Sequence, residues 1–431
     1  MLIRSRWQET AMAAVVLVSI AQQPVLAQGL PAASPEQVGL SSDRLERIAA
    51  VVEREIKENR VAGTVTLVAR NGRVAWFKAQ GMMDREGGKP MRPDAIFRIC
   101  SMTKPITSTA VMMLYEEGRF LLNDPVSKFL PEFKNPKVLV KPASGKPYTI
   151  PASNEITIKH LLTHTAGLAY HWTDPVLGPR YRDSGVAHGA LQYNGTAADS
   201  IKALAALPLL FNPGERYEYS LSIDVLGRLV EVVSGTTLDE FFRKRIFEPL
   251  RMTDTQFFLT EDKVPRLATA YTWYEGKGLN RFPDQPIDEG ALVYSANYPY
   301  RGPKTLYSGG AGLLSTASDY ARFCQMILDG GKLDGTRLLS RKSVELMTHD
   351  QLGKVKPDMG FGLGFGVYGV KAPLEELGSP GKFGWGGFYY TRFFIDPKEK
   401  MFGVFLAQVH PYAGLTLHQT LETLAYQAIV D

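Results

Sequence analysis

Strand-like sequence lies near both ends of this 431-residue chain, and helix-like sequence fills the middle. Near the N-terminus, "GTVTLVARNGRVAWFKAQG" alternates apolar and polar residues around Asn71-Gly72, a pair suited to the positive φ angles of a tight hairpin turn. Near the C-terminus, "FGWGGFYYTRFFIDP" and "MFGVFLAQV" are rich in aromatic and branched residues, and a helical tail follows from about residue 414. This order predicts an α+β fold, with an antiparallel sheet built from N- and C-terminal segments, flanked by helices, and an inserted, mainly helical region.

Two of the expected helices have clear beginnings or ends. The stretch "SSDRLERIAAVVEREIKEN" opens with Ser41 and Ser42, either of which can cap a helix. Its apolar residues follow the three- and four-residue spacing of an amphipathic helix: Leu45, Ile48, Val52 and Ile56. In "SIDVLGRLVEVVSG" the same spacing ends at Gly235, a typical helix stop. We expect residues 28–97 and 305–431 to form the sheet region and residues 98–304 the mainly helical region.

Residues 1–27 have the pattern of an export signal. Two arginines give a positive head, residues 11–21 are almost wholly apolar, and Val25 and Ala27 put small residues before a cleavage point. A membrane anchor is the alternative, but this apolar run is much shorter than the roughly 20 residues that span a bilayer. The pattern predicts a periplasmic or secreted protein with no stable membrane insertion after signal cleavage.

The composition and the missing motifs exclude several classes of function. The net charge of +5 is small and no run of five or six like charges occurs, so we expect no nucleic-acid partner. His160 and His164 are four residues apart, but no carboxylate or cysteine is placed beside them, which favours packing over a metal site. Gly-x-Gly-x-x-Gly at a strand-to-helix turn and Gly-x-Ser-x-Gly are absent. We therefore expect no metal, no organic cofactor and a small-molecule substrate.

The stretch "RICSMTKPITSTAVMMLYEEGRF" holds Ser101 and Lys104 three positions apart at the head of an expected helix. That helix spans residues 103–117, with Pro105 tolerated in its first turn and Gly118 closing it. Residues three apart on a helix face the same way, so Lys104 can reach the Ser101 hydroxyl. A serine hydroxyl is a weak nucleophile until a base or a cation lies beside it. The pair predicts a nucleophile with its activator; the simpler interpretation is a helix cap and a solvated lysine.

The Ser-x-x-Lys spacing alone is weak support, because it occurs again from Ser379 to Lys382. In that copy Pro380 and Gly381 forbid a helical turn, so the serine and the lysine are not held on one face. The role of Ser101 therefore depends on the rest of the chain.

Long stretches of the chain resemble one known superfamily. The segment "RICSMTKPITSTAVMMLYEEGRFLLNDPVSKFLPEF" resembles the first active-site segment of the serine beta-lactamases and penicillin-binding proteins. "HLLTHTAGL" at residues 160–168 resembles another recurring segment of that group. The resemblance is strongest to class C beta-lactamases and their esterase relatives, the family VIII carboxylesterases, and covers nearly all of the chain after the signal. It implies one catalytic unit of the beta-lactamase-like fold, with Ser101 as nucleophile and Lys104 as its partner.

The resemblance also implies a catalytic tyrosine. "PGERYEYSLSIDVLGRLVEVVSG" is similar to the esterase version of the second motif, which places that tyrosine at Tyr219. A phenol beside a lysine ammonium is pushed toward its ionised form, which can take the proton of the serine. Class C beta-lactamases have Tyr-x-Asn here, whereas Leu221 stands at the asparagine position, which weighs against beta-lactam hydrolysis. Tyr217, two residues away, and the "SAN" tripeptide from Ser295 to Asn297 are the alternatives.

The third motif of the lactamases is Lys-Thr-Gly, and at the matching place this chain has Trp385-Gly386-Gly387, which resembles the Trp-Gly-Gly of family VIII esterases. Glycines let the backbone come close to a substrate, so these three residues are expected to contact it. The resemblance assigns the oxyanion hole to the backbone amides of Ser101 and Phe388. Trp385 replaces the cation that would bind the carboxylate of a penicillin or a D-alanyl peptide, so an apolar ester is the expected substrate.

These observations predict an exported serine hydrolase that cleaves carboxylic esters through an acyl-enzyme on Ser101. One alternative is a beta-lactamase or a D-amino-acid-specific peptidase of the same superfamily. A second is a non-catalytic penicillin-binding or sensor protein that keeps the fold. The accepted acyl length depends on the loops at residues 170–200 and 274–304, which are long and rich in Tyr, Pro and Gly. Neither that length nor the oligomeric state follows from the sequence.

Overall fold

The computed structural model describes residues 29–431 of the chain. The signal peptide predicted over residues 1–27 lies outside the described residues. Within the described part of the chain, no helix is both long enough and apolar enough to cross a membrane.

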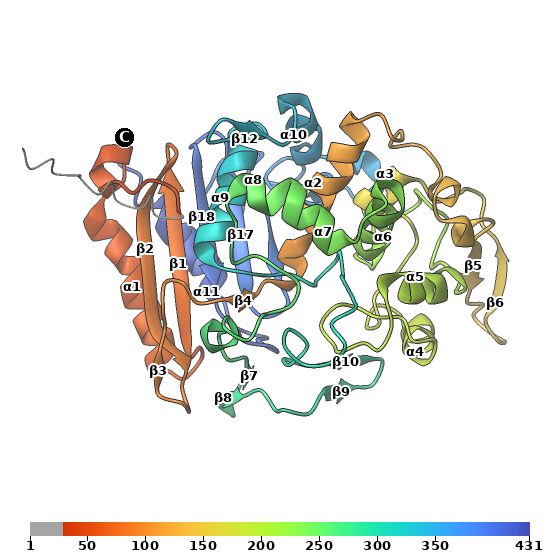
Figure 1. The fold of residues 1–431 in the computed structure, drawn as a ribbon, viewed down its shortest axis with the longest axis horizontal. Coiled ribbons are helices and arrows are strands. Elements are labelled where there is room, and N and C mark those ends of the chain that lie inside the picture. The colour runs from red at the N-terminus through yellow and green to blue at the C-terminus, as the bar shows by residue number, and fades with distance from the viewer. Residues whose placement is uncertain (1–28) are drawn as a thin grey trace, which may run out of the picture.

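An eight-stranded antiparallel sheet is the largest element of the fold, and both ends of the chain contribute to it (Figure 1). Strand β1 from the N-terminal segment pairs with β18 from the C-terminal segment, with Val65 opposite Leu406. The predicted α+β fold and its shared sheet are therefore confirmed. In order across the sheet, the strands are β14 (Gly360–Phe361), β15 (Gly366–Val367), β16 (Phe383–Gly387), β17 (Thr391–Asp396), β18 (Met401–Leu406), β1 (Gly63–Arg70), β2 (Arg73–Asp84) and β3 (Lys89–Pro90).

The first hairpin joins β1 to β2 at the predicted turn. Asn71 and Gly72 have φ angles of 53° and 77°, the left-handed conformations that a tight hairpin turn needs. β1 is buried along its whole length, because packed side chains cover both of its faces. Its polar Thr66 is correspondingly paired: the hydroxyl accepts a hydrogen bond from the indole of Trp76 at 2.8 Å. This bond satisfies a polar group that would otherwise be costly to bury.

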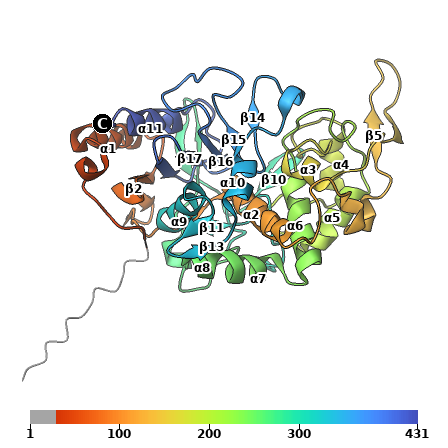
Figure 2. The same ribbon diagram turned by 90° about the horizontal axis from the view of Figure 1, so that it is seen from above.

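Helices cover both faces of the sheet (Figure 2). On one face, α1 (Ser42–Lys57) packs beside α11 (Leu417–Tyr426). On the other face, α9 (Ala317–Leu328) packs against β1 and β18. Ser41 caps α1 by accepting a hydrogen bond from the amide of Arg44. The helix predicted from the apolar spacing is thus confirmed, and so is the C-terminal helical tail.

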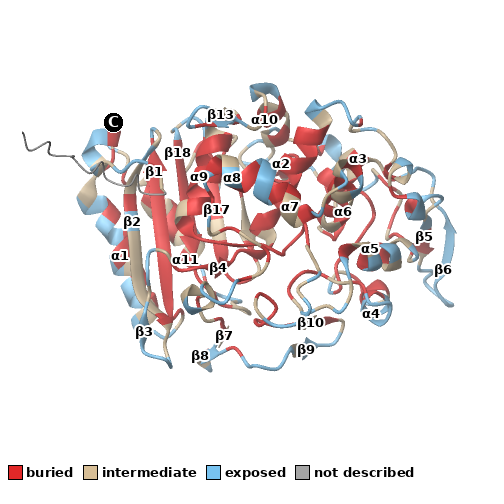
Figure 3. Ribbon diagram, viewed as in Figure 1, coloured by how far each residue is buried: buried red, intermediate tan, exposed pale blue. Residues whose placement is uncertain are grey.

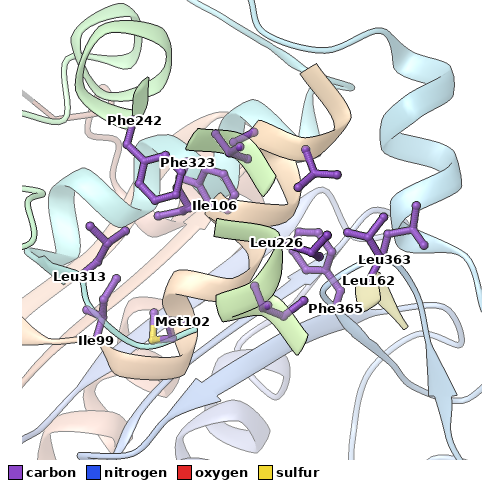
Figure 4. Close-up of a cluster of buried hydrophobic side chains, with 14 of the residues drawn as sticks. Ile99, Met102, Ile106, Leu162, Leu226, Phe242, Leu313, Phe323, Leu363 and Phe365 are labelled. Atoms are coloured by element: carbon purple, nitrogen blue, oxygen red, sulfur yellow. The ribbon is translucent and has the colours of Figure 1, made fainter. Parts of the chain in front are cut away.

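The remaining helices lie mostly on the side of the sheet that α9 covers, with α2 at their centre (Figures 1 and 3). Every residue from Thr103 to Leu114 of α2 is buried, as in a helix enclosed by other elements. Figure 4 shows Ile106 of α2 near Leu226 of α6 and Phe323 of α9. These helices are α2 (Thr103–Glu116), α3 (Ile158–Leu162), α4 (Leu177–Asp183), α5 (Ala197–Ala205), α6 (Ser222–Ser234), α7 (Leu238–Phe242), α8 (Glu248–Leu250) and α10 (Arg341–Thr348).

The segment expected to be mainly helical, residues 98–304, holds α2 to α8 and also several short strands. Three local hairpins are formed by β5 (Lys137–Val140) with β6 (Tyr148–Pro151), β7 (Tyr271–Tyr274) with β8 (Gly278–Arg281), and β9 (Ile287–Glu289) with β10 (Leu292–Tyr294). Two further pairs are β4 (Phe97–Arg98) with β11 (Leu314–Ser315) and β12 (Lys332–Leu333) with β13 (Thr336–Arg337). The region boundaries after residues 97 and 304 stay predictions.

The second Ser-x-x-Lys copy joins the sheet to α11. Lys382 is buried, and its ammonium forms an ion pair with Glu422 of α11 at 2.7 Å. The same ammonium donates to the carbonyl of Leu377. Ser379 donates through its backbone amide to the carboxylate of Asp396. Lys382 therefore forms a structural ion pair.

Several histidines are neutral in the folded protein because they are buried. Burial lowers the pKa of His171 and of His418 to about 3, and that of His410 to about 4. In an unfolded chain a histidine has a pKa of about 6.5, so below that pH the unfolded chain binds protons that the folded protein does not. The free energy of unfolding should therefore fall as the pH drops from about 6.5 towards about 4.

Replacing His418 by Phe keeps an aromatic ring stacked on Tyr390 and removes one titrating group. We expect the dependence of the unfolding free energy on pH to become shallower by up to about 1.4 kcal/mol per pH unit between pH ~6.5 and ~4. Urea unfolding of both proteins at several pH values across that range measures the two slopes. Equal slopes would show that His418 is protonated in the folded protein as readily as in the unfolded chain.

Candidate active site

Ser101 lies in a short 3-10 turn, Cys100–Met102, that leads directly into α2. This is the predicted place at the head of a helix, and Gly118 follows the helix in a left-handed conformation, with φ 70°. Cys100 has φ 42°, a left-handed conformation that costs about 1–2 kcal/mol for a residue with a side chain. The surrounding packing holds this strained turn, and Ser101 remains partly exposed.

The ammonium of Lys104 is fully buried and donates three hydrogen bonds. These bonds reach Ser101 Oγ at 3.1 Å, the hydroxyl of Tyr170 at 2.9 Å and the carbonyl of Gly310 at 2.8 Å. A buried ammonium is costly unless hydrogen bonds replace the lost water, and here all three of its N–H groups have partners. Lys104 is therefore not a solvated lysine, and it lies beside Ser101 as the helix spacing predicts.

Tyr219 lies against the same serine oxygen. Its hydroxyl is hydrogen-bonded to Ser101 Oγ at 2.7 Å, and the Lys104 ammonium lies 4.7 Å from the centre of its ring. The indole of Trp385 donates to the Tyr219 hydroxyl at 3.4 Å. The structure thus brings together the serine, lysine and tyrosine that the sequence analysis selected, with the tryptophan of the third motif beside them.

The two alternatives to Tyr219 have other surroundings. Tyr217 packs among aromatic rings, and burial raises its pKa far above the usual range of a phenol. Ser295 is buried, and the side chain of Asn297 donates to a backbone carbonyl. Among residues 29–431, neither Tyr217 nor Ser295 forms a hydrogen bond with Ser101.

Tyr170 is a site residue that the sequence analysis missed. It is buried, and its hydroxyl accepts a hydrogen bond from Lys104. Burial, together with the nearby Tyr219 and Asp224, raises the pKa of Tyr170 well above its usual range, so its phenol stays neutral. The half-exposed Trp172 stacks on it, with ring centres 4.4 Å apart. Tyr170 follows "HLLTHTAGL" by two residues, and its proximity to that segment is the signal that could have located it.

Asp224, in the first turn of α6, holds the loop whose carbonyl accepts from Lys104. Its carboxylate accepts hydrogen bonds from the hydroxyl of Ser308 and from the amide of Gly310. A Cβ on Gly310 would collide with the other carboxylate oxygen, so a larger residue here would have to displace the Asp224 carboxylate. Burial raises the pKa of Asp224, and the charge of Lys104 opposes that shift. The carboxylate and the ammonium therefore interact across Gly310 without a direct ion pair.

The end of β16, which contains residues 385–387, runs beside the turn that carries Ser101. A Cβ on Gly387 would collide with the carbonyl oxygen of Ile99, so only glycine permits this close approach. Among the described residues, the backbone amides of Ser101 and Phe388 donate to no other group. Two unpaired donors on adjacent segments are what the predicted oxyanion hole requires.

Apolar side chains occupy the two positions where the chain departs from the lactamase motifs. Trp385 directs its ring towards Tyr219 and Phe361, with ring centres 5.4 and 5.3 Å away. Leu221 immediately precedes α6 and is buried in the main core. The site therefore has an indole where the lactamases have a lysine, and a leucine where they have an asparagine.

The histidine pair and the cysteines lie among packed residues. His160 lies in α3, where its Nδ1 accepts the amide of Thr157, whereas His164 lies beyond the helix with φ 54°. Within residues 29–431, no group of three His, Cys, Asp or Glu side chains is placed to hold a metal ion. Cys100 and Cys324 are both buried and unbonded, and burial raises the pKa of Cys100 to about 11.

A partly exposed serine oxygen held between a buried lysine and a tyrosine, beside two unpaired amides, defines the site of a serine hydrolase. The comparisons with known proteins agree. The chain belongs to the Beta-lactamase family, whose model matches residues 48–425.

Relatives of known name span most of the chain. Protein Rv1367c of Mycobacterium tuberculosis is 36% identical over 365 residues, which cover 81% of this chain and 86% of the relative. Esterase EstB of Burkholderia gladioli is 34% identical over 382 residues, which cover 85% of this chain and 92% of the relative. The solved structure of EstCE1, described as a hydrolase with promiscuous acyltransferase activity, matches with a TM-score of 0.77 and 30% identity. That match covers 89% of this chain and 99% of EstCE1.

Substituting Ala for Gly387 should damage the site without unfolding the protein. The added Cβ must push the end of β16 away from Ile99, and therefore away from Ser101. Because misplacement by about 1 Å can cost about 100-fold in rate, we expect hydrolysis of p-nitrophenyl acetate to fall roughly 10- to 100-fold. Gly384→Ala is the matched control, since its Cβ would collide with the carbonyl oxygen of Phe393 on the neighbouring strand and not with Ile99. Similar rates for the two variants would contradict the close-approach argument.

Proposed function

We propose that this serine hydrolase cleaves carboxylic esters through an acyl-enzyme on Ser101. The observation that carries the proposal is the position of Ser101 Oγ, 3.1 Å from the Lys104 ammonium and 2.7 Å from the Tyr219 oxygen. A group that takes a proton must lie within hydrogen-bond reach of it, as the Tyr219 oxygen does, and the Lys104 ammonium lies close enough to stabilise the negative charge that forms. Ser101 is also partly exposed, so a substrate can approach it.

The proposed reaction begins when Ser101 Oγ attacks the ester carbonyl and its proton passes to the Lys104–Tyr219 pair, in which Tyr219 reacts as the phenolate and the Lys104 ammonium stabilises it. The carbonyl electron pair moves onto oxygen, and the amides of Ser101 and Phe388 stabilise the resulting oxyanion. The tetrahedral intermediate collapses, the bond to the alcohol breaks, and the alcohol leaves with the transferred proton. Water then attacks the acyl-enzyme by the same steps, which release the carboxylic acid and restore the Ser101 hydroxyl.

Uncharged esters are the proposed substrate class. Trp385 occupies the place of the lysine that would bind a substrate carboxylate, and its ring extends the aromatic surface formed by Tyr219 and Phe361. Two relatives support this class by name, esterase EstB and lovastatin esterase, the second 31% identical over 369 residues. Trp385, Gly386 and Gly387 are the proposed substrate contacts.

Two alternatives use the same serine. A beta-lactamase or a D-amino-acid-specific peptidase would hydrolyse nitrocefin or a D-alanyl peptide much faster than an ester. A non-catalytic penicillin-binding or sensor protein would keep a stable acyl adduct on Ser101, visible by mass spectrometry, and release no product. The apolar residues Trp385 and Leu221 favour the esterase over the first alternative. The hydrogen bonds of Ser101 with Lys104 and Tyr219 favour it over the second.

We also propose that the protein is exported and that residues 1–27 are removed. The arginine-containing head and short apolar run of this segment support the proposal. N-terminal sequencing of protein recovered from the periplasm and the culture medium tests it directly: a mature chain that still begins at Met1 would refute it.

Ser101→Ala should abolish turnover of p-nitrophenyl acetate and butyrate, because no other nucleophile replaces the hydroxyl. Tyr219→Phe should lower kcat by roughly 100- to 10,000-fold while the KM changes little, as expected for the loss of a proton-transfer group. Tyr217→Phe is the matched control and should retain most of the activity. The rates are measured by p-nitrophenolate release, with nitrocefin and a D-alanyl peptide as competing substrates.

Unchanged turnover by Ser101→Ala would overturn the mechanism. Faster hydrolysis of nitrocefin or of the D-alanyl peptide than of the esters would select the first alternative. A panel of esters with increasing acyl length then identifies which chain the site accepts.

A further inference from the structure

His164 contacts the backbone on both sides of Tyr219 and the tyrosine ring itself. The amide of Glu218 donates to the carbonyl of His164 at 2.9 Å, and the amide of Ser220 donates to its Nδ1 at 3.2 Å. The His164 ring lies against Tyr219, with ring centres 4.9 Å apart. One residue therefore binds the amide before Tyr219, the amide after it and the side chain between them.

The backbone conformation of His164 makes this double contact possible. His164 lies just beyond α3 with φ 54°, a left-handed conformation that is unfavourable for most residues and easier for Asn. Further bonds join the same two segments: the amide of Gly214 donates to the carbonyl of Thr165, and that of Leu221 to Ala169. "HLLTHTAGL" and the tyrosine motif are thus joined along their length, with His164 opposite Tyr219.

The hydrogen bonds assign one protonation state to the His164 ring. Nδ1 accepts the amide of Ser220, and the Ser220 hydroxyl, also 3.2 Å away, can donate to it as well, so the single proton of the neutral ring is on Nε2. Nε2 is buried and forms no hydrogen bond within the described part of the chain; the rings of Tyr217 and Phe361 lie edge-on nearby. A second proton would turn Nδ1 into a donor facing a donor. Burial and the charge of Lys104 lower the pKa of His164 well below its usual value, so the ring stays an acceptor.

We propose that His164 is a positioning residue that clamps Tyr219 within hydrogen-bond reach of Ser101. Among the described residues it forms no hydrogen bond with Ser101, and it acts by fixing the backbone and ring of the tyrosine. The proposal goes beyond the reaction proposed above by adding a further residue, and it rests on the role of Tyr219 in that reaction. Proton transfer over a 2.7 Å contact requires this precision, because small displacements are costly in rate.

The test compares three substitutions at His164 with one control. Asn offers an oxygen where Nδ1 stands and tolerates the left-handed backbone, so His164→Asn should keep the clamp. His164→Gln moves its oxygen towards the place of Nε2, and His164→Ala offers no acceptor, so both should lose it. His160→Asn changes the other histidine of the motif, which caps α3, and reports the effect of weakening the segment alone.

Two measurements are made on each variant after its thermal unfolding midpoint has shown that it is folded. The first is the kcat and KM for p-nitrophenyl acetate. The second is the rate at which a fluorophosphonate labels Ser101, followed by intact mass, which requires an activated serine but no particular ester. For His164→Ala and His164→Gln we expect both kcat and the labelling rate to fall roughly 10- to 100-fold, with KM changed less than about threefold. His164→Asn and His160→Asn should stay within about threefold of the parent.

The outcomes separate this proposal from the proposed function. If the parent is labelled at Ser101 but cleaves no ester, the ester substrate is wrong and the labelling rates still test the clamp. Labelling of His164→Ala at the parental rate would overturn the clamp while ester cleavage stands. Equal losses in His164→Asn and His164→Gln, or a loss in His160→Asn as large as in His164→Ala, would reduce His164 to a structural role and overturn the proposal.

Discussion

The three hydrogen bonds of one buried ammonium join the parts of the molecule that form the site. Lys104 reaches Ser101 on the turn before its own helix, Tyr170 on a loop after α3 and the carbonyl of Gly310 on a loop after the last inserted hairpin. If this buried ammonium lost one of its partners, an unpaired N–H group would destabilise the folded protein. Each of the three segments is therefore held in place. The geometry around Ser101 follows from satisfying this single charge.

The sheet and the enclosed helix α2 provide a rigid frame for that charge. α2 is buried along nearly its whole length, so the end that carries Ser101 has little freedom to shift. The end of β16 approaches the same turn so closely that Gly387 has no room for a side chain. The backbone amides of Ser101 and Phe388, which lie on these two segments, donate to no other described residue. Backbone packing, more than side-chain chemistry, therefore forms the candidate oxyanion hole.

The parts of the fold that could be predicted are those with local signals. The Asn71-Gly72 turn, the amphipathic α1 and the shared sheet were predicted from turn chemistry and residue periodicity. The pairing of Ser101 with Lys104 followed from helix geometry, and a resemblance placed Tyr219. Tyr170 escaped prediction because a loop brings it to Lys104, and no periodicity marks a loop residue. Asp224 escaped because its effect passes through the backbone of Gly310, 86 positions away in the chain.

By itself, the sequence determined the elements and the residues that share one helical turn, because turn preference and residue spacing act between near neighbours. It also determined the apolar character of the site through Trp385 and Leu221, which are chemical facts about single positions. Only the tertiary structure decided which acceptors surround Lys104, that Gly387 abuts Ile99, and that His164 holds both amides beside Tyr219. These contacts join residues far apart in the chain and depend on burial, so no local pattern specifies them; they form only when the whole core has closed.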